Sequence, residues 1–192
     1  MTLADGLRES LNADHDLEVL AGDVPTLEGE PVEAAVLIAI TDRPEPGVIL
    51  TVRRNDLRTH AGQIAFPGGR LDPGEDAVGA ALREAWEEVE LDPARATVVG
   101  KLTPYRTITN YTVTPIIAVI PPDLPLRPHE REVADWFEAP LAHLVDPANH
   151  VLQSRIFQGQ QRNYYEIMWG KRRIWGATAA IIVNLARRLQ WA

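Results

Sequence analysis

Hydrophobic residues in much of the chain form short runs separated by turn-forming residues, a pattern typical of β-strands. Runs at residues 34–40 and 48–52 lie on either side of the Pro- and Gly-containing segment 42–47, which predicts a β-hairpin. Further strands are expected at residues 97–102, 112–120 and 133–137. Pro121 and Pro122 should end the second of these, because proline cannot donate a ladder hydrogen bond.

A second pattern, with hydrophobic residues three or four positions apart, predicts helices at residues 77–89 and 174–189. The apolar stripe of the first consists of Val78, Ala81, Leu82, Ala85 and Val89. The stripe of the second, which we expect to be a packed surface helix, consists of Ala177, Ile181, Ile182, Leu185 and Leu189. A short N-terminal helix is expected at residues 3–11. Strand pairs with a central helix and a late helix indicate an α/β (α+β) fold, with a mixed sheet between helices.

Length and composition agree with a single domain. The 192 residues are 45% hydrophobic and 24% charged, which is enough to bury a substantial core. We therefore expect residues 1–192 to form one domain, with the terminal helices as extensions of it. The chain has no cysteine, which excludes disulfides and thiol nucleophiles and fits a reducing compartment.

Charge and hydropathy argue against two kinds of partner. A net charge of −8 and a pI near 5.1 disfavour a nucleic-acid-binding surface, although a small nucleotide substrate stays compatible. No apolar run reaches the roughly 18 residues of a membrane span, and residues 1–5 do not resemble a secretory leader. A cytoplasmic protein is therefore expected, and the sequence leaves a homodimer possible.

The helix expected at residues 77–89 concentrates acidic side chains on one face. Glu84, Glu87 and Glu88 are three and four positions apart, so their carboxylates lie side by side and repel one another. Glu75 adds a carboxylate just before the helix, and Asp76 is a suitable N-cap. Such a cluster can be an ordinary solvated face, but oxygen ligands without cysteine also suit Mg²⁺ or Mn²⁺.

The spacing of these residues resembles the Nudix box, G-x5-E-x7-R-E-U-x-E-E-x-G-U. Gly69, Glu75 and the run Arg83-Glu84-Ala85-Trp86-Glu87-Glu88-Val89 match it at every charged position. Glu90 stands where the family usually has glycine, which would suit a left-handed helix end. Glu90 is therefore expected to cost about 1 kcal/mol or to shift the end of the helix. The resemblance implies a Nudix-type α/β/α sandwich.

Arginines cluster just before the glycine turn, which we define as Phe66-Pro67-Gly68-Gly69. Arg53, Arg54 and Arg58 form a positive spot in an acidic chain, which suits a substrate with several phosphates. The segment resembles the signature of the coenzyme A pyrophosphatase branch, L-L-T-x-R-[SA]-x3-R-x3-G-x3-F-P-G-G, with Ile49 for the first leucine and Arg54 for the small residue. The alternative is that Arg53 and Arg54 end a strand on a solvated edge.

The resemblance also implies roles for individual residues. Metal ligands would be Glu84, Glu87 and Glu88, with Glu75 as an outer ligand or an orienting group and Arg83 pairing with a glutamate of the box. The general base is left open between Glu84 and Glu132, and Glu132 is as well explained as an ordinary surface residue. Substrate-binding residues would be Arg53, Arg58, Gly62, Phe66, Gly68 and Gly69.

Three functions fit these residues. The first is Mg²⁺- or Mn²⁺-dependent hydrolysis of coenzyme A or acyl-CoA, giving adenosine 3′,5′-bisphosphate and 4′-phosphopantetheine or its acyl derivative. The second is hydrolysis of another nucleoside diphosphate derivative, such as ADP-ribose, a dinucleotide or a modified nucleotide, because the box specifies the chemistry and not the leaving group. The third is a Nudix-fold binding module without turnover.

We assign no functional site to the histidines or to the aromatic pairs. His60 could touch a phosphate, but a loop histidine is more often a hydrogen-bonding turn residue. The pairs Tyr164-Tyr165 and Trp136-Phe137 could stack on an adenine, yet they are expected to pack in the core or at a sheet edge.

Overall fold

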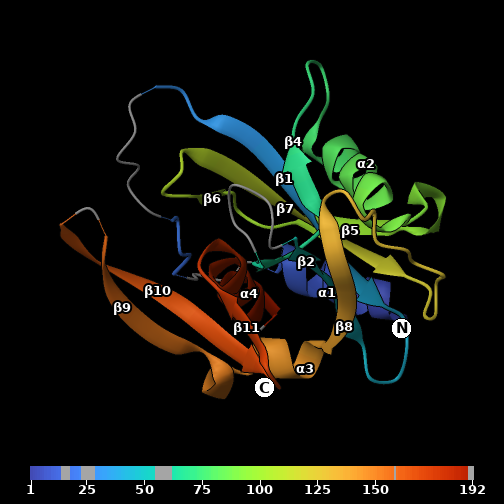
Figure 1. Cartoon of the computed structure of the whole chain (residues 1–192). Helices are drawn as coiled ribbons and strands as arrows, with labels where there is room; N and C mark the ends of the chain where they lie inside the picture. Colours follow the sequence, from blue (N-terminus) through green and yellow to red (C-terminus); the bar gives the residue numbers. More distant parts are fainter. Residues whose placement is uncertain (14–17, 23–28, 55–61, 158, 190–192) are drawn as a thin grey trace.

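The computed structural model describes residues 1–13, 18–22, 29–54, 62–157 and 159–189 (Figure 1). Its helices are α1 (Leu3–Asn12), α2 (Ala77–Val89), α3 (Leu141–Val145) and α4 (Ala177–Leu189). An eight-stranded sheet contains β1 (Val32–Thr41), β2 (Gly47–Arg53), β3 (Ile64–Ala65), β4 (Gly68–Arg70), β5 (Thr97–Lys101), β6 (Tyr105–Arg106), β7 (Tyr111–Ile120) and β8 (Val133–Pro140). A three-stranded sheet contains β9 (Val151–Phe157), β10 (Gln160–Trp169) and β11 (Arg172–Trp175).

The larger sheet is mixed, as expected, and β1 lies at its centre. Strand β1 runs parallel to β7 over ten residue pairs, from Val32 opposite Tyr111 to Thr41 opposite Ile120. It is antiparallel to β2 and to the short strand β4, which pairs with the start of β1. The hairpin between β1 and β2 is confirmed, and β8 extends the sheet on the far side of β2. The glycine turn therefore enters the sheet next to its central strand.

Helices cover both faces of the larger sheet (Figure 1). Alternate residues of β1 belong to two separate cores: Ala35, Leu37 and Ala39 pack with α2, whereas Ala34, Ile38 and Ile40 pack with α1 and α4. This arrangement confirms the α/β/α sandwich. It also places the acidic helix α2 alone on one face, directly over the strand that receives the glycine turn.

The C-terminal helix differs from its prediction in start and in burial. Residues 172–175 form β11, with Ile174 opposite Ile167 of β10, and the helix begins after Gly176, whose φ is 64°. Every residue from Ala179 to Leu185 is buried, so α4 is not a surface helix. It lies between the larger sheet with α1 on one side and the three-stranded sheet on the other (Figure 1).

The buried stripe of α2 was also predicted slightly wrongly. The buried residues are Ala80, Ala81, Ala85, Glu88 and Val89, while Val78 and Leu82 are only partly buried. The helix is thus turned so that one of its glutamates, Glu88, points inward beside the sheet rather than toward solvent.

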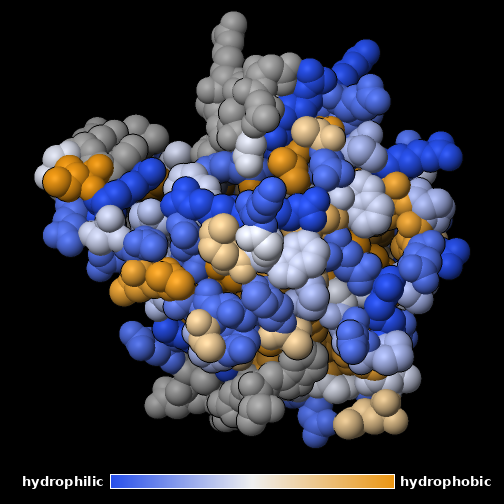
Figure 2. Space-filling view, turned by 60° about the horizontal axis from the view of Figure 1, so that its bottom comes forward, coloured by the Kyte–Doolittle hydropathy of each residue, from blue (hydrophilic) through white to orange (hydrophobic). Residues whose placement is uncertain are grey.

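The surface carries scattered hydrophobic residues. On the face shown in Figure 2 they lie as separate spots among polar side chains. None of the helices in the described parts of the chain is long and apolar enough to cross a membrane.

Candidate active site

Both ends of α2 have the geometry that the sequence indicates. Asp76 caps the start, and its carboxylate accepts a hydrogen bond from the backbone N–H of Gly79 at 2.7 Å. Glu90 ends the helix in the left-handed conformation, with φ of 55° and ψ of 33°. The helix end is therefore not shifted. A non-glycine residue holds the strained conformation instead, and its cost of about 1 kcal/mol stays a prediction.

Two glycines allow the turn to lie against α2 and β1. A Cβ atom on Gly69 would come within 2.3 Å of Glu84 Oε1, so only glycine leaves room for that carboxylate. A Cβ atom on Gly68 would lie 2.4 Å from the backbone oxygen of Ala35 in β1. The backbone N–H of Gly68 donates to Glu88 Oε2 at 3.3 Å. The turn is thus fitted to two glutamates of the helix, as well as to the sheet.

Arg83 joins the acidic side chains to one another. Its Nε and Nη2 atoms donate to the two carboxylate oxygens of Glu75, each at 3.0 Å. Its Nη1 atom donates to Glu84 at 2.9 Å and to Glu87 at 3.1 Å, and Nη2 also donates to the backbone oxygen of Arg70 at 3.0 Å. These hydrogen bonds lower the pKa of Glu75 and raise that of Arg83. Arg83 therefore fixes the rotamers of three carboxylates.

Glu88 is the most unusual carboxylate of the group. It is only 7% exposed, and burial, followed by the charge of Glu84, raises its pKa to about 8. The backbone N–H of Gly68 and the positive charge of Arg53 lower that pKa only in part. Burial also raises the pKa of Glu84, and the charge of Glu132 raises both pKa values. Negative charge is therefore crowded at this end of α2.

These carboxylates fit a hard divalent cation. Among the described residues, no group of three His, Cys, Asp or Glu side chains is already arranged to hold a metal ion. Arg83 instead draws Glu84 and Glu87 toward itself. The donors are all oxygens, and the buried Glu88 keeps its ordinary acidity only if positive charge lies beside it. A divalent cation would supply that charge.

The other predicted site residues lie around this group. Arg53 is close enough to Glu88 to affect its pKa, and its Nε atom is buried without a hydrogen-bond partner in the described structure. Gly62, with φ of 68°, donates its N–H to the backbone oxygen of Arg53 at 3.1 Å. Phe66 is 3% exposed, so its side chain packs beneath the turn. Arg58 and His60 lie outside the described residues.

Glu132 comes to the site through the loop before β8. Its backbone N–H donates to the backbone oxygen of His129, and the N–H of His129 donates to the backbone oxygen of Glu88 at 2.8 Å. The side chain of Glu132 is exposed, and its charge acts on Glu84 and Glu88. The structure thus brings Glu132 to the box, while its role stays a prediction.

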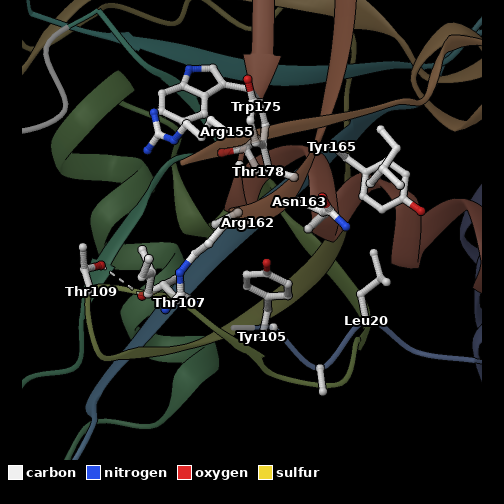
Figure 3. A pocket seen from close by; sticks show the side chains of 18 of the residues that line it. Leu20, Tyr105, Thr107, Thr109, Arg155, Arg162, Asn163, Tyr165, Trp175 and Thr178 are labelled. Atoms are coloured by element: carbon white, nitrogen blue, oxygen red, sulfur yellow. Dashed lines mark hydrogen bonds between the residues drawn. The ribbon is translucent and has the colours of Figure 1, made fainter. Parts of the chain in front are cut away.

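A cavity of about 640 Å³ between the two sheets was missed by the sequence analysis. It is lined by β6 and the turn after it, by β9, β10 and β11, and by the start of α4 (Figure 3). Tyr164 and Tyr165 lie in its wall, although they were expected only to pack. Glycines in turns mark the missed strands: Gly159, Gly170 and Gly176 all have positive φ and stand at the ends of β10 and β11.

Comparison with known proteins decides the family. The NUDIX domain model matches residues 31–158. The chain belongs to the Nudix hydrolase family. An uncharacterized Nudix hydrolase of Shigella flexneri, NudL, is 43% identical over 86% of this chain and 88% of its own length. NudL of Escherichia coli is 44% identical over 82% of each chain.

Solved structures agree with this Nudix hydrolase in fold. The Nudix hydrolase RenU of M. smegmatis has 25% identity and a TM-score of 0.52, over 60% of this chain and 74% of its own. A MutT/nudix family protein of Enterococcus faecalis, with 15% identity and a TM-score of 0.50, covers 97% of this chain and 73% of its own and shows the fold alone. Nudix hydrolases generally use divalent metals and act on nucleoside diphosphate derivatives, which agrees with the acidic site on α2.

Proposed function

We propose that this Nudix hydrolase cuts the diphosphate bond of coenzyme A or acyl-CoA in the presence of Mg²⁺ or Mn²⁺. The products would be adenosine 3′,5′-bisphosphate and 4′-phosphopantetheine or its acyl derivative. The observation that carries the proposal is that Arg53, a residue of the branch signature, is near enough to the buried Glu88 of the Nudix box for its charge to lower the pKa of Glu88. A phosphate-binding cation near the carboxylates that would hold a metal supports a substrate with several phosphates.

In this proposal Glu84, Glu87 and Glu88 hold the cation. When bound, it would offset the negative charge of the diphosphate and lower the pKa of the attacking water. Arg83 keeps Glu75 and Glu84 in fixed rotamers, which is a positioning role. The Gly68–Gly69 turn gives these carboxylates room and presents backbone N–H groups.

The general base would be a carboxylate at the rim of this group. Glu84 is half-buried with a raised pKa, which suits a group that accepts a proton near neutral pH. Glu132 is the second candidate, since its charge reaches both Glu84 and Glu88. Substitution of each by glutamine separates the two, because loss of the base moves the acidic limb of the pH–rate profile, whereas loss of a surface charge does not.

Arg53 and Arg58, both residues of the branch signature, would bind substrate phosphates. Arg53 reaches the Glu88 end of the site, which suits the diphosphate itself. Arg58 stays a prediction from the sequence. Gly62 and Phe66 would act through the backbone of the turn, since Gly62 bonds to Arg53 and Phe66 is buried.

The same site would also suit another nucleoside diphosphate derivative, which is the second candidate. The decisive experiment is to incubate the purified protein and Mg²⁺ with CoA, dephospho-CoA, ADP-ribose, NADH and nucleoside triphosphates, and to identify products by mass. The proposal expects the highest kcat/KM for CoA or an acyl-CoA. A higher value for ADP-ribose or NADH would move the assignment to the second candidate.

We further propose that residues 1–192 act as one unit. Helices α1 and α4 flank the matched segment 31–158 and pack into the same core, with Arg188 donating to the backbone oxygen of Leu11. A cytoplasmic location and a homodimer remain predictions from the sequence.

A further inference from the structure

The cavity between the two sheets is separate from the acidic face of α2, yet it is linked to the glycine turn by short hydrogen-bonded steps. Thr107, in the cavity wall, accepts from the backbone N–H of Tyr111 at 3.0 Å. The hydroxyl of Tyr111 accepts from Arg70 Nε at 2.9 Å. The backbone oxygen of Arg70 in turn accepts from Arg83. Three contacts therefore separate the cavity wall from the arginine that orders the carboxylates.

A second link runs through the strand that precedes the turn. Gln63 lines the cavity, and its backbone oxygen accepts from the backbone N–H of Arg53 at 2.9 Å. The charge of Arg53 in turn acts on Glu88. This backbone hydrogen bond joins the strand end that carries Arg53 to the wall of the cavity.

Two arginines of the cavity wall lie directly opposite each other. Arg155 in β9 and Arg162 in β10 are cross-strand partners, so their side chains leave the sheet on the same face. They are two positive side chains in a chain whose net charge is −8. Figure 3 shows Arg162 running across the cavity toward Thr107, while Arg155 lies against Trp175. Two guanidinium groups from neighbouring strands therefore line the cavity, and guanidinium groups are well suited to bind a phosphate.

Aromatic rings stand beside the arginines. The Arg155 guanidinium lies 5.2 Å from the centre of the Trp175 ring and 5.8 Å from that of Tyr164. These two rings meet edge to face, with centres 5.8 Å apart. Tyr105 and Tyr165 line the cavity from other elements (Figure 3). Flat aromatic surfaces next to guanidinium groups are suited to a heterocyclic base that carries a phosphate.

The cavity also has the right size for one end of such a substrate. Its volume of about 640 Å³ lies within the range of small-molecule sites, roughly 300–1,000 Å³. The rest of the wall consists mostly of apolar side chains and of uncharged side chains with an amide or hydroxyl group. Leu20, Asn163 and Thr178 are examples. A fatty-acyl chain would make no use of the two arginines, so a phosphorylated base is favoured.

We propose that this cavity binds the phosphorylated purine nucleoside end of the substrate, with Arg155 and Arg162 as the site of a phosphate that does not react. The proposal rests on the proposed hydrolysis of a CoA-like diphosphate for its choice of substrate. It places the recognition of the second phosphate in β9 and β10 rather than in the arginine-rich segment before the glycine turn.

Binding of a product tests the cavity without turnover. Isothermal titration with adenosine 3′,5′-bisphosphate and with AMP, in EDTA, is compared for the wild type, Arg155→Ala, Arg162→Ala and Arg95→Ala. Arg95 is an exposed arginine in the short 3-10 helix Pro93–Arg95 that follows α2, outside the cavity wall, and serves as the control. The expected result is a Kd for the bisphosphate about tenfold to a hundredfold higher in both cavity variants, with little change for AMP or in the control.

Unchanged affinity for the bisphosphate in Arg155→Ala and Arg162→Ala, or an equal loss for both ligands, would overturn the proposal. Arg155 is exposed, so its variant should fold even if Arg162→Ala does not. Arg58→Ala tests the alternative site for the second phosphate. If this variant alone loses the preference for the bisphosphate over AMP, the second phosphate is bound by the segment before the glycine turn, and the cavity proposal fails.

Kinetics separate this proposal from the proposed function. If wild-type protein hydrolyses CoA but Arg155→Ala keeps the wild-type ratio of kcat/KM for CoA and dephospho-CoA, only the cavity proposal fails. If the wild type hydrolyses no CoA while the titration shows the expected losses, the cavity assignment holds and the proposed substrate fails.

Discussion

Gly69 lies so close to Glu84 that a Cβ atom would sit 2.3 Å from the carboxylate oxygen Oε1. The backbone of Gly69 has no positive φ, and the clashing atom is the end of a flexible side chain. Gly69→Ala should therefore fold normally but displace the Glu84 carboxylate. We expect kcat to fall by about 10- to 100-fold, because small displacements of a reacting group are costly, with little change in Tm. A variant with normal activity would show that the close approach has no catalytic purpose.

Gly68→Ala should behave in the opposite way. Its Cβ would meet backbone atoms, 2.4 Å from the oxygen of Ala35 and 2.6 Å from the Cα of Val36, and neither can rotate away. We expect the free energy of unfolding to fall by about 1–3 kcal/mol, as for other overpacked sites. Urea unfolding of both glycine variants measures the contrast. Equal stability losses at Gly68 and Gly69 would contradict it.

Arg83→Lys tests whether geometry or charge orders the carboxylates. Lysine keeps the positive charge but cannot bond Glu75 through two atoms while also reaching Glu84 and Glu87. We expect kcat/KM to fall about 10- to 100-fold, as when partners that orient metal ligands are lost. The pKa of Glu75 should rise toward its ordinary value, since its lowering comes first from the Arg83 hydrogen bonds. Near-normal kinetics would reduce Arg83 to a charge-balancing role.

Glu88→Gln and Glu87→Gln test the metal ligands. Glutamine keeps a side-chain oxygen that can accept from the Gly68 N–H, so Glu88→Gln should preserve the turn. Each variant should lose about 10²-fold or more in turnover at saturating Mg²⁺, because a charged ligand is removed. Glu90→Gln, an exposed neighbour at the helix end, should keep wild-type turnover. Full activity of either ligand variant would remove it from the metal site.

The raised pKa of Glu88 gives metal-free protein a distinctive pH dependence. The folded state holds a proton up to about pH 8, whereas the unfolded chain releases it near the ordinary value of 4.5. Stability from this group is therefore complete at low pH and is lost as pH rises through about 8. Between pH 6 and 9 the loss should be about 3 kcal/mol in EDTA.

Denaturant titrations at these two pH values measure that loss. Glu75 does not contribute there, because its lowered pKa leaves it ionised in both states. Glu88→Gln should flatten the dependence, and Mg²⁺ should reduce it in the wild type. An unchanged slope in Glu88→Gln would assign the effect to another group.

The site on α2 could be predicted because its determinants are local in sequence. The helix bounds, the Asp76 cap and the left-handed position of Glu90 all follow from spacing within about twenty residues. The inward turn of Glu88 could not be predicted in this way. Its burial depends on β1 and on the glycine turn, which approach from elsewhere in the chain, so a helical stripe read from α2 alone placed Glu88 on the polar face.

The cavity could not be predicted, because it forms between elements far apart in the sequence. Its wall joins β6 to strands β9 and β10 and to α4, and strands with polar residues on both faces give no clear alternation. Ile174 shows the difficulty well. Its spacing fits the apolar stripe of the last helix, yet it lies in β11 and pairs with Ile167 of β10, because Gly176 separates the strand from the helix.

The most direct test of the account is the identity of the products from CoA. Wild-type protein, Glu88→Gln and Glu90→Gln are incubated with CoA and Mg²⁺, and the products are separated and weighed by mass spectrometry. The account predicts adenosine 3′,5′-bisphosphate and 4′-phosphopantetheine in equal amounts from the wild type and Glu90→Gln, and almost none from Glu88→Gln. Intact CoA in the wild-type reaction, under conditions in which ADP-ribose or NADH is cut, would contradict it.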